Sequence, residues 1–160
     1  MRGRDRIRTR RVLAAGALAT CLAIGVTAPP VAQAGPLRTK LLGIINRIRE
    51  NHDLRALRLN VRLSEDAKRH TRKMIRRGEL FDPRNLAELL EPYRWDDVGA
   101  DVVGCHDTLN AMVRQWMGES FHRRIILHPG LRRAGVAVIR VYGRSACGRD
   151  QLWATAIMYG

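Results

Sequence analysis

The segment WMGESFHRRIILHPGLRRAGVAVIR, residues 116–140, decides the fold of this 160-residue chain. It opens at Trp116, inside an apolar pattern of helical spacing, and Pro129-Gly130 ends the helical part. Ala134 to Tyr142 is almost continuously apolar, which is typical of a strand buried on both faces. After a turn, Leu152 to Tyr159 predicts a closing strand that forms a hairpin with it. The chain therefore changes from helix to β-hairpin across this segment.

Further helices are expected upstream of this segment. Apolar residues at helical spacing predict a helix over 37–51 and a second one that starts near Ser64, the expected N-cap, and ends at Gly78. Helices early and strands late fit an α+β or a layered α/β/α domain. The other expected elements are an extended connector at 54–60, a helical turn at 85–90, a strand at 98–103, a helix from near Asp107 and a short helix at 120–127.

The first residues have the order of a secretory signal peptide. Arg2 to Arg11 holds six arginines against one acid, and Val12 to Val26 is an apolar run. The small-residue triplet Ala32-Gln33-Ala34 follows, so we expect cleavage after Ala34. Fifteen apolar residues fall short of the roughly 20 needed to span a bilayer. The predicted organisation is a signal peptide at 1–34, a single domain at 35–160, and secretion without a transmembrane helix in the mature chain.

Two features of this leader leave its route and fate open. Thr9-Arg10-Arg11 before the apolar run suggests twin-arginine export instead of the general secretory route. Leu18-Ala19-Thr20-Cys21 resembles a lipoprotein box, which would leave a lipidated Cys21 on the membrane, although threonine before the cysteine is atypical. A lipoprotein is the minor alternative to a freely secreted protein.

Cleavage changes the charge of the chain. The mature part has 126 residues (160 minus 34), 23 Lys and Arg (29 minus 6) and 14 Asp and Glu (15 minus 1), which gives a net charge of +9. Outside the cytoplasm such a surface meets anionic envelope polymers or lipids, and nucleic acid becomes a disfavoured partner. The arginines are scattered, so solubility alone is an equally good reading of the charge. We expect a monomer.

Two cysteines remain after cleavage, Cys105 and Cys147. In an oxidising compartment a pair of cysteines favours a disulfide over two free thiols. No Cys-x-x-Cys motif is present, so neither a zinc ribbon nor a thioredoxin-type site is indicated.

From Asp107 onwards the residues resemble one known family. The motifs are Trp116-Met117-x-x-x-x-His122-Arg123 with Pro129 after it, then Gly135-Val136-Ala137-Val138, then Trp153. They resemble the bacterial branch of the CAP superfamily, the cysteine-rich secretory, antigen 5 and pathogenesis-related proteins, also called SCP-domain proteins. Asn46-x-x-Arg49 and the 57–60 and 63–78 segments extend the resemblance to about residues 37–159. It implies a three-layer α/β/α sandwich of the CAP (SCP) type, with helices early, a β-hairpin at the C-terminus and a surface cleft.

In that family two histidines and two acidic residues line the cleft and can hold a divalent metal. His122 matches the second histidine and Glu119 matches one acidic position. Counted from Gly78, the place of the first histidine falls on Asp82. The remaining acid falls on Ala100, beside Asp101. Two of the four positions differ from the residues that the family has there, so the resemblance implies a degenerate metal site. The cleft candidates are His122, Glu119, Asp82 and Asp101.

The residues themselves allow two readings of this cleft. Glu119 and His122 are three apart, so on a helix they share a face, and Asp82 would add a third ligand for zinc or calcium. Three ligands with an open position are how zinc activates water for hydrolysis, with Asp101 or His106 as a fourth neighbour. Alternatively, His122 is satisfied locally, Glu119 faces water and Asp82 is a turn residue before proline.

These readings give two hypotheses for function. The first is a secreted, non-enzymatic CAP-domain binding protein at the cell envelope or outside the cell. The second is a divalent-metal-dependent hydrolase of peptide or wall polymer. Extracellular binding of nucleic acid rests on charge alone, and we assign no residue a catalytic role.

Overall fold

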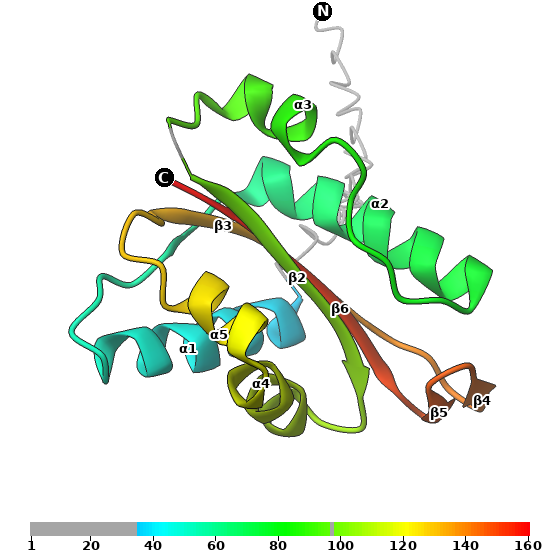
Figure 1. Ribbon diagram of the computed structural model, residues 1–160. Coiled ribbons are helices and arrows are strands. Elements are labelled where there is room, and N and C mark those ends of the chain that lie inside the picture. Colours follow the sequence, from blue (N-terminus) through cyan, green and yellow to red (C-terminus); the bar gives the residue numbers. More distant parts are fainter. Residues whose placement is uncertain (1–34, 97) are drawn as a thin grey trace, which may run out of the picture. The chain divides into compact units, whose positions relative to one another are not determined.

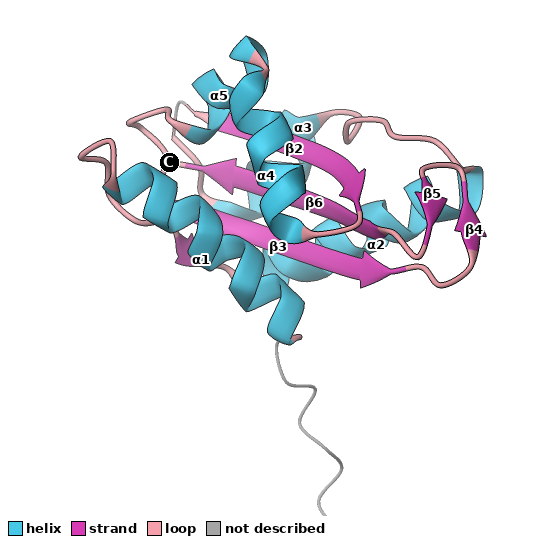
Figure 2. Cartoon of the chain, turned by 90° about the horizontal axis from the view of Figure 1, so that it is seen from below, coloured by secondary structure: helices cyan, strands magenta, loops and turns pink. Residues whose placement is uncertain are grey.

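The computed structural model describes residues 35–96 and 98–160, whose central sheet lies between two layers of helices (Figure 1 and Figure 2). The predicted signal peptide, its cleavage site and Cys21 lie outside the described residues. In chain order the elements are α1 (Pro36–Glu50), β1 (Arg58–Leu59), α2 (Val61–Arg77), α3 (Leu86–Leu90), the 3-10 helix η1 (Glu91–Tyr93), β2 (Gly99–His106), α4 (Leu109–Gly118), α5 (Ser120–Ile126), β3 (Arg133–Arg140), β4 (Arg144–Ser145), β5 (Gly148–Arg149) and β6 (Leu152–Tyr159).

The main sheet has four strands in the order β1-β3-β6-β2. β6 is antiparallel to both of its neighbours, and Val136, Ala156 and Val102 lie side by side across the three strands. The short β1 is parallel to β3 at the far edge. All eight residues of β6 are buried, because helices cover both faces of this central strand. The predicted hairpin between the last two long strands is confirmed.

Each face of the sheet has its own apolar core. Figure 2 shows α1, α4 and α5 over one face, and their core includes Ile45, Trp116 and Met158. On the opposite face α2 and α3 pack over a second core that includes Leu63 and Ile157. Neighbouring residues of β6 point to opposite faces, so Ile157 and Met158 belong to different cores. The expected three-layer α/β/α arrangement is confirmed.

The second helix begins earlier than predicted. Its N-cap is Asn60, whose side-chain oxygen accepts a hydrogen bond from the Leu63 amide at 3.1 Å. Ser64 lies one turn inside the helix, where its buried hydroxyl donates to the Asn60 carbonyl and accepts from the Val136 amide. The prediction of a start at Ser64 was therefore wrong, because that hydroxyl links α2 to β3 and caps nothing. The predicted end is confirmed, with Gly78 at φ +66° in the left-handed region that favours glycine.

The helix and the sheet touch most closely at Gly135. A Cβ atom at this position would come within 2.5 Å of the Leu63 carbonyl carbon, so only glycine allows α2 to lie this close to β3. The strand is shorter than predicted, because it ends at Arg140 and Tyr142 is exposed. Strand β2 is longer than predicted and reaches His106.

Cys105, near the end of β2, and Cys147, in the turn between the short strands β4 and β5, form a disulfide with a Cα–Cα distance of 6.3 Å. The predicted pairing is confirmed. The bond attaches the small β4–β5 hairpin to an edge strand of the main sheet. No helix in the described part of the chain is long and apolar enough to cross a membrane.

Candidate functional site

Glu119 and His122 form a pair where α4 meets α5. Glu119 is the N-cap residue of α5, and its Oε2 lies 2.5 Å from Nδ1 of His122. The imidazole N–H at Nδ1 donates to the carboxylate, which fixes the tautomer and leaves Nε2 available. Gln115 donates to the other carboxylate oxygen at 3.2 Å. Glu119 and His122 thus lie next to each other, and the exposed ring of Phe121 lies beside His122.

Asp82 and Asp101 form a second acidic pair, from the loop after α2 and from β2. Asp101 pairs with Ile157 in the strand register and so faces the α2 layer. Burial raises the pKa of Asp101 to about 7, and the negative charge of Asp82 adds to that rise. Oδ2 of Asp101 is buried and has no hydrogen-bond partner among the described residues. A carboxyl group with this pKa is about half protonated at pH 7 and is neutral at lower pH.

His70 of α2 belongs to the same region, although its sequence position gave no sign of it. Its Nε2 lies 2.7 Å from the Phe81 carbonyl oxygen, and the two rings meet edge to face. Burial lowers the pKa of His70, while the Phe81 carbonyl and Asp82 act in the opposite direction. A neutral imidazole therefore donates from Nε2 to the carbonyl of Phe81, the residue before Asp82.

The structure brings the four cleft candidates together only as two separate pairs. No hydrogen bond or ion pair joins Asp82 or Asp101 to Glu119 or His122 among the described residues. Within residues 35–96 and 98–160 no group of three or more His, Cys, Asp and Glu side chains is arranged to hold a metal ion. Of the three predicted ligands, the described arrangement places Glu119 and His122 in direct contact. The set of His122, Glu119 and Asp82 stays a prediction.

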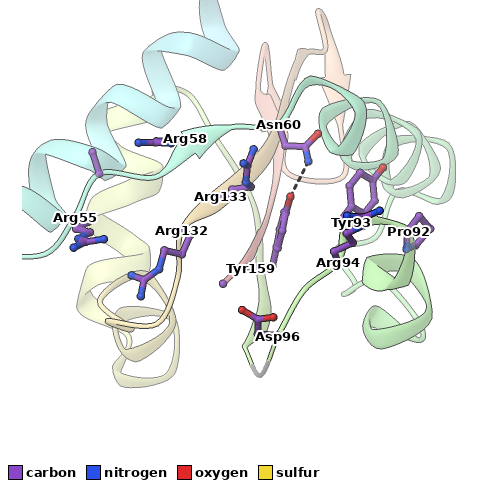
Figure 3. A pocket seen from close by; sticks show the side chains of 12 residues that line it. Arg55, Arg58, Asn60, Pro92, Tyr93, Arg94, Asp96, Arg132, Arg133 and Tyr159 are labelled. Carbon is purple, nitrogen blue, oxygen red and sulfur yellow. Dashed lines mark hydrogen bonds between the residues drawn. The ribbon is translucent and has the colours of Figure 1, made fainter.

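A different site appears where β1, the start of β3 and the end of β6 meet residues 92–96 (Figure 3). It is a pocket of about 950 Å³. Figure 3 shows Arg55 and Arg132 on one side, Tyr93 and Arg94 on the other, and Asp96 below Tyr159. We call it the arginine pocket, after the five arginines in its lining, Arg55, Arg58, Arg94, Arg132 and Arg133.

The arginine pocket is strongly positive. Its five arginine side chains are exposed, and Asp96 is the one acidic side chain among the described lining residues. No carboxylate of the described residues forms an ion pair with any of these arginines. Their charges are therefore available to an anion from solution.

A sixth arginine, Arg49 of α1, lies fully buried behind this pocket. Its guanidinium donates to four backbone carbonyl oxygens, those of Arg55, Ile126, His128 and Leu131, at 2.9, 2.6, 3.1 and 3.3 Å. Burial lowers the pKa of Arg49, and the nearby charge of Arg132 lowers it further. The two loops that carry Arg55 and Arg132 are thus attached to one buried cation.

Asn46, one turn before Arg49, fixes the same connector from another side. Its side-chain amide donates to the Leu57 carbonyl at 3.0 Å and accepts from the Leu57 amide at 2.8 Å. Leu57 is buried, while its neighbour Arg58 is exposed and lines the pocket. The Asn46-x-x-Arg49 pattern therefore supports one wall of the arginine pocket.

Sequence reasoning missed this pocket because its arginines come from three separate segments of the chain. They are spread over residues 55–133 with no common period, so the basic residues looked scattered. The adjacent Arg132 and Arg133, which follow the Pro129-Gly130 turn, were the one local signal.

Comparisons with known proteins agree with the fold. A family model, the cysteine-rich secretory protein family (CAP), matches residues 42–157. A cysteine-rich secretory protein from Staphylococcus aureus is similar, with a TM-score of 0.61 and 19% identity over 82% of this chain and 40% of that protein. An extracellular SCP-domain protein from Bacillus anthracis has a TM-score of 0.58 and 17% identity, over 77% of this chain and 40% of that one.

A third similar structure is an outer surface protein from Borrelia burgdorferi, with a TM-score of 0.60 and 13% identity over 76% of this chain and 92% of that protein. The chain thus covers less than half of the Staphylococcus and Bacillus proteins. No curated protein matches the chain. At these identities the solved structures show a shared fold, and the family model covers more than half of the sequence. The chain belongs to the CAP, or cysteine-rich secretory protein, family.

Proposed function

We propose that this chain is an exported CAP-domain protein that binds an anionic partner at the cell envelope or outside the cell, without catalysing a reaction. Export is supported by the leader-like order of residues 1–34 and by the extracellular description of the similar Bacillus protein. The observation that carries the binding proposal is the arginine pocket, whose described lining holds five exposed arginines and one acidic side chain. Clustered arginines with few carboxylates attract anions and speed their association.

A pelleting assay tests this function on the protein expressed from the full sequence. We expect it to bind vesicles or insoluble polymers that carry negative charge and to ignore neutral phosphatidylcholine vesicles. Binding should weaken as salt rises from about 50 to 500 mM, because exposed charges are screened at that ionic strength. If the protein binds no anionic material at low salt, the proposed function is wrong.

The metal-dependent hydrolase stays the competing hypothesis, and the Glu119–His122 pair is the observation in its favour. Calorimetric titration with zinc and calcium separates the two hypotheses. His122→Ala is the variant, and His52→Ala, at an exposed histidine in the turn after α1, is its control. The binding function predicts no stoichiometric uptake. Saturable uptake that His122→Ala abolishes and His52→Ala preserves would favour the hydrolase.

Mass spectrometry of the exported protein, before and after reduction, tests the predicted export and the cleavage of the signal peptide. We expect a chain that starts at Gly35 and gains two hydrogens on reduction, from the disulfide between Cys105 and Cys147. A chain that starts at Cys21 with added lipid mass would instead establish the lipoprotein alternative.

A further inference from the structure

We infer that the arginine pocket binds a ligand that carries two or more phosphate groups, on a small molecule or along a polymer. This inference rests on the proposed function and names the chemistry that its site selects. It is carried by the charge of the lining, by the kind of donors it presents and by the way its walls are fixed.

The charge of the pocket matches more than one phosphate. The side chains of five arginines and one aspartate in the described lining sum to a charge of +4 (5 minus 1). A phosphate monoester carries about −1.5 to −2 at neutral pH, so about two such groups neutralise it. A single carboxylate would leave most of this charge uncompensated. The volume of about 950 Å³ also exceeds what one small anion fills.

The donors in the lining suit phosphate oxygens. Every basic residue in it is arginine, whose planar guanidinium binds phosphate through two parallel hydrogen bonds. Tyr159 adds a neutral donor: its hydroxyl oxygen accepts from Nδ2 of Asn60 at 2.9 Å, so its own hydrogen is not used in that bond. Tyr93 differs, because its hydroxyl donates to Asp66.

The walls of the pocket are held in place before a ligand arrives. Arg49 joins the loops of Arg55 and Arg132 through backbone carbonyls. The backbone of these loops therefore loses little further conformational entropy when a ligand binds. On the other side Arg94 ends η1 at φ +52°, a left-handed conformation that is uncommon for arginine. Such strain is kept where surrounding structure imposes it, and it clusters at binding sites.

The surroundings favour a phosphate-bearing polymer or small molecule over a bilayer. The large apolar side chains that the described residues expose are those of Val61, Leu80, Phe121 and Tyr142, and none of them lines the pocket. A surface that inserts into a membrane needs such side chains around its basic residues. A concave site instead takes a group that can enter it.

Calorimetry with inorganic pyrophosphate, orthophosphate and acetate tests the inference on the full chain. We expect pyrophosphate to bind at least about tenfold more tightly than orthophosphate, and acetate to show no uptake, because only pyrophosphate presents two phosphate groups. Equal affinity for orthophosphate and pyrophosphate, or no uptake of either, would overturn the inference.

A matched pair of variants locates the site. Arg132→Gln/Arg133→Gln removes two charges from the pocket, and Arg123→Gln/Arg124→Gln removes two from exposed adjacent arginines on α5. We expect the first to weaken pyrophosphate binding by about tenfold or more and the second by less than about twofold. Equal losses in both would show that net charge alone attracts the anion. If the first variant fails to fold, Arg94→Asn removes a pocket charge at a backbone angle that asparagine tolerates.

Competition experiments with anions from different sources then distinguish this inference from the proposed function. A soluble poly(glycerol phosphate) should compete with pyrophosphate, and the competition should be lost in Arg132→Gln/Arg133→Gln. Competition by phosphatidylglycerol vesicles but not by this polymer would overturn the inference in favour of a membrane, as would competition by single-stranded DNA alone in favour of nucleic acid. If the protein pellets with anionic material while neither arginine pair matters, the proposed function survives and the pocket inference fails.

Discussion

Arg49 reaches across the fold to Ile126, 77 positions later in the chain, and donates to its carbonyl oxygen at 2.6 Å. Both partners are buried, and no carboxylate of the described residues pairs with the guanidinium. The cation is stabilised by four backbone carbonyl dipoles, so its loss would leave several buried acceptors without a donor.

We therefore predict that Arg49→Met lowers the free energy of unfolding by about 3 kcal/mol or more, because each stranded carbonyl costs about 1–3 kcal/mol. Arg47→Met is the control, since Arg47 lies exposed on the same helix. Urea unfolding followed by circular dichroism measures both variants. A similar stability for the two would mean that the carbonyl contacts contribute nothing.

Asp101→Asn should change how stability depends on pH. Burial first, and Asp82 second, raise the pKa of Asp101 to about 7, against about 3.9 for an unfolded aspartate. The folded chain thus binds this proton more tightly, so its stabilising effect is complete below about pH 4 and is lost as the pH rises through 7. Asparagine stays neutral, and we expect the variant to gain stability at pH 8, on the order of 4 kcal/mol.

Urea midpoints between pH 4.5 and 8 check this expectation. The wild-type midpoint should fall with rising pH more steeply than that of Asp101→Asn, and Glu50→Gln, at an exposed carboxylate, should follow the wild type. Parallel curves for all three proteins would show that Asp101 does not titrate in this range.

Two glycines should respond in opposite directions to the same substitution. Gly135→Ala places a Cβ 2.5 Å from the Leu63 carbonyl carbon, and we expect a loss of about 2–3 kcal/mol from overpacking. Gly43→Ala puts a methyl group in open space within α1, where alanine should gain about 0.5–1 kcal/mol through helix propensity. Thermal unfolding of both variants gives the comparison. A tolerated Gly135→Ala would contradict the close packing of α2 on β3.

The disulfide should be worth about 3–4 kcal/mol, because joining cysteines 42 positions apart restricts the unfolded chain. We expect Cys105→Ala/Cys147→Ala to lose that amount in urea unfolding. A reductant should destabilise the wild type and leave the variant unchanged. If the reductant shifts neither protein, the two sulfurs are not joined in solution.

Much of this fold could be predicted, because its strongest signals are local. Helical spacing placed α1, Gly78 marked the end of α2, and the apolar run at 152–159 matched β6. The start of α2 could not be resolved, since Asn60 and Ser64 are both good caps and only tertiary contact with Val136 decides between them. The disulfide followed from cysteine number and compartment.

The functional surface was less predictable because it depends on contacts between distant residues. The Glu119–His122 pair could be foreseen, as both lie within one helical turn. The proximity of Asp82 to Asp101 and to His70 depends on how the loop after α2 returns over the sheet. The arginine pocket depends on β1 pairing with β3, which places Arg58 opposite Arg133 in register.

Arg49 supports the backbone of the pocket walls, whereas the exposed side chains on those walls determine which ligand can bind. Its hydrogen bonds go to main-chain oxygens of the loops in these walls and of the end of α5, so the side chains that the loops display take no part in those bonds. Exposed side chains such as Arg55 and Arg132 can then be replaced without moving the backbone that carries them. A protein built in this way can acquire a new ligand by a few surface substitutions, while the buried framework stays constant.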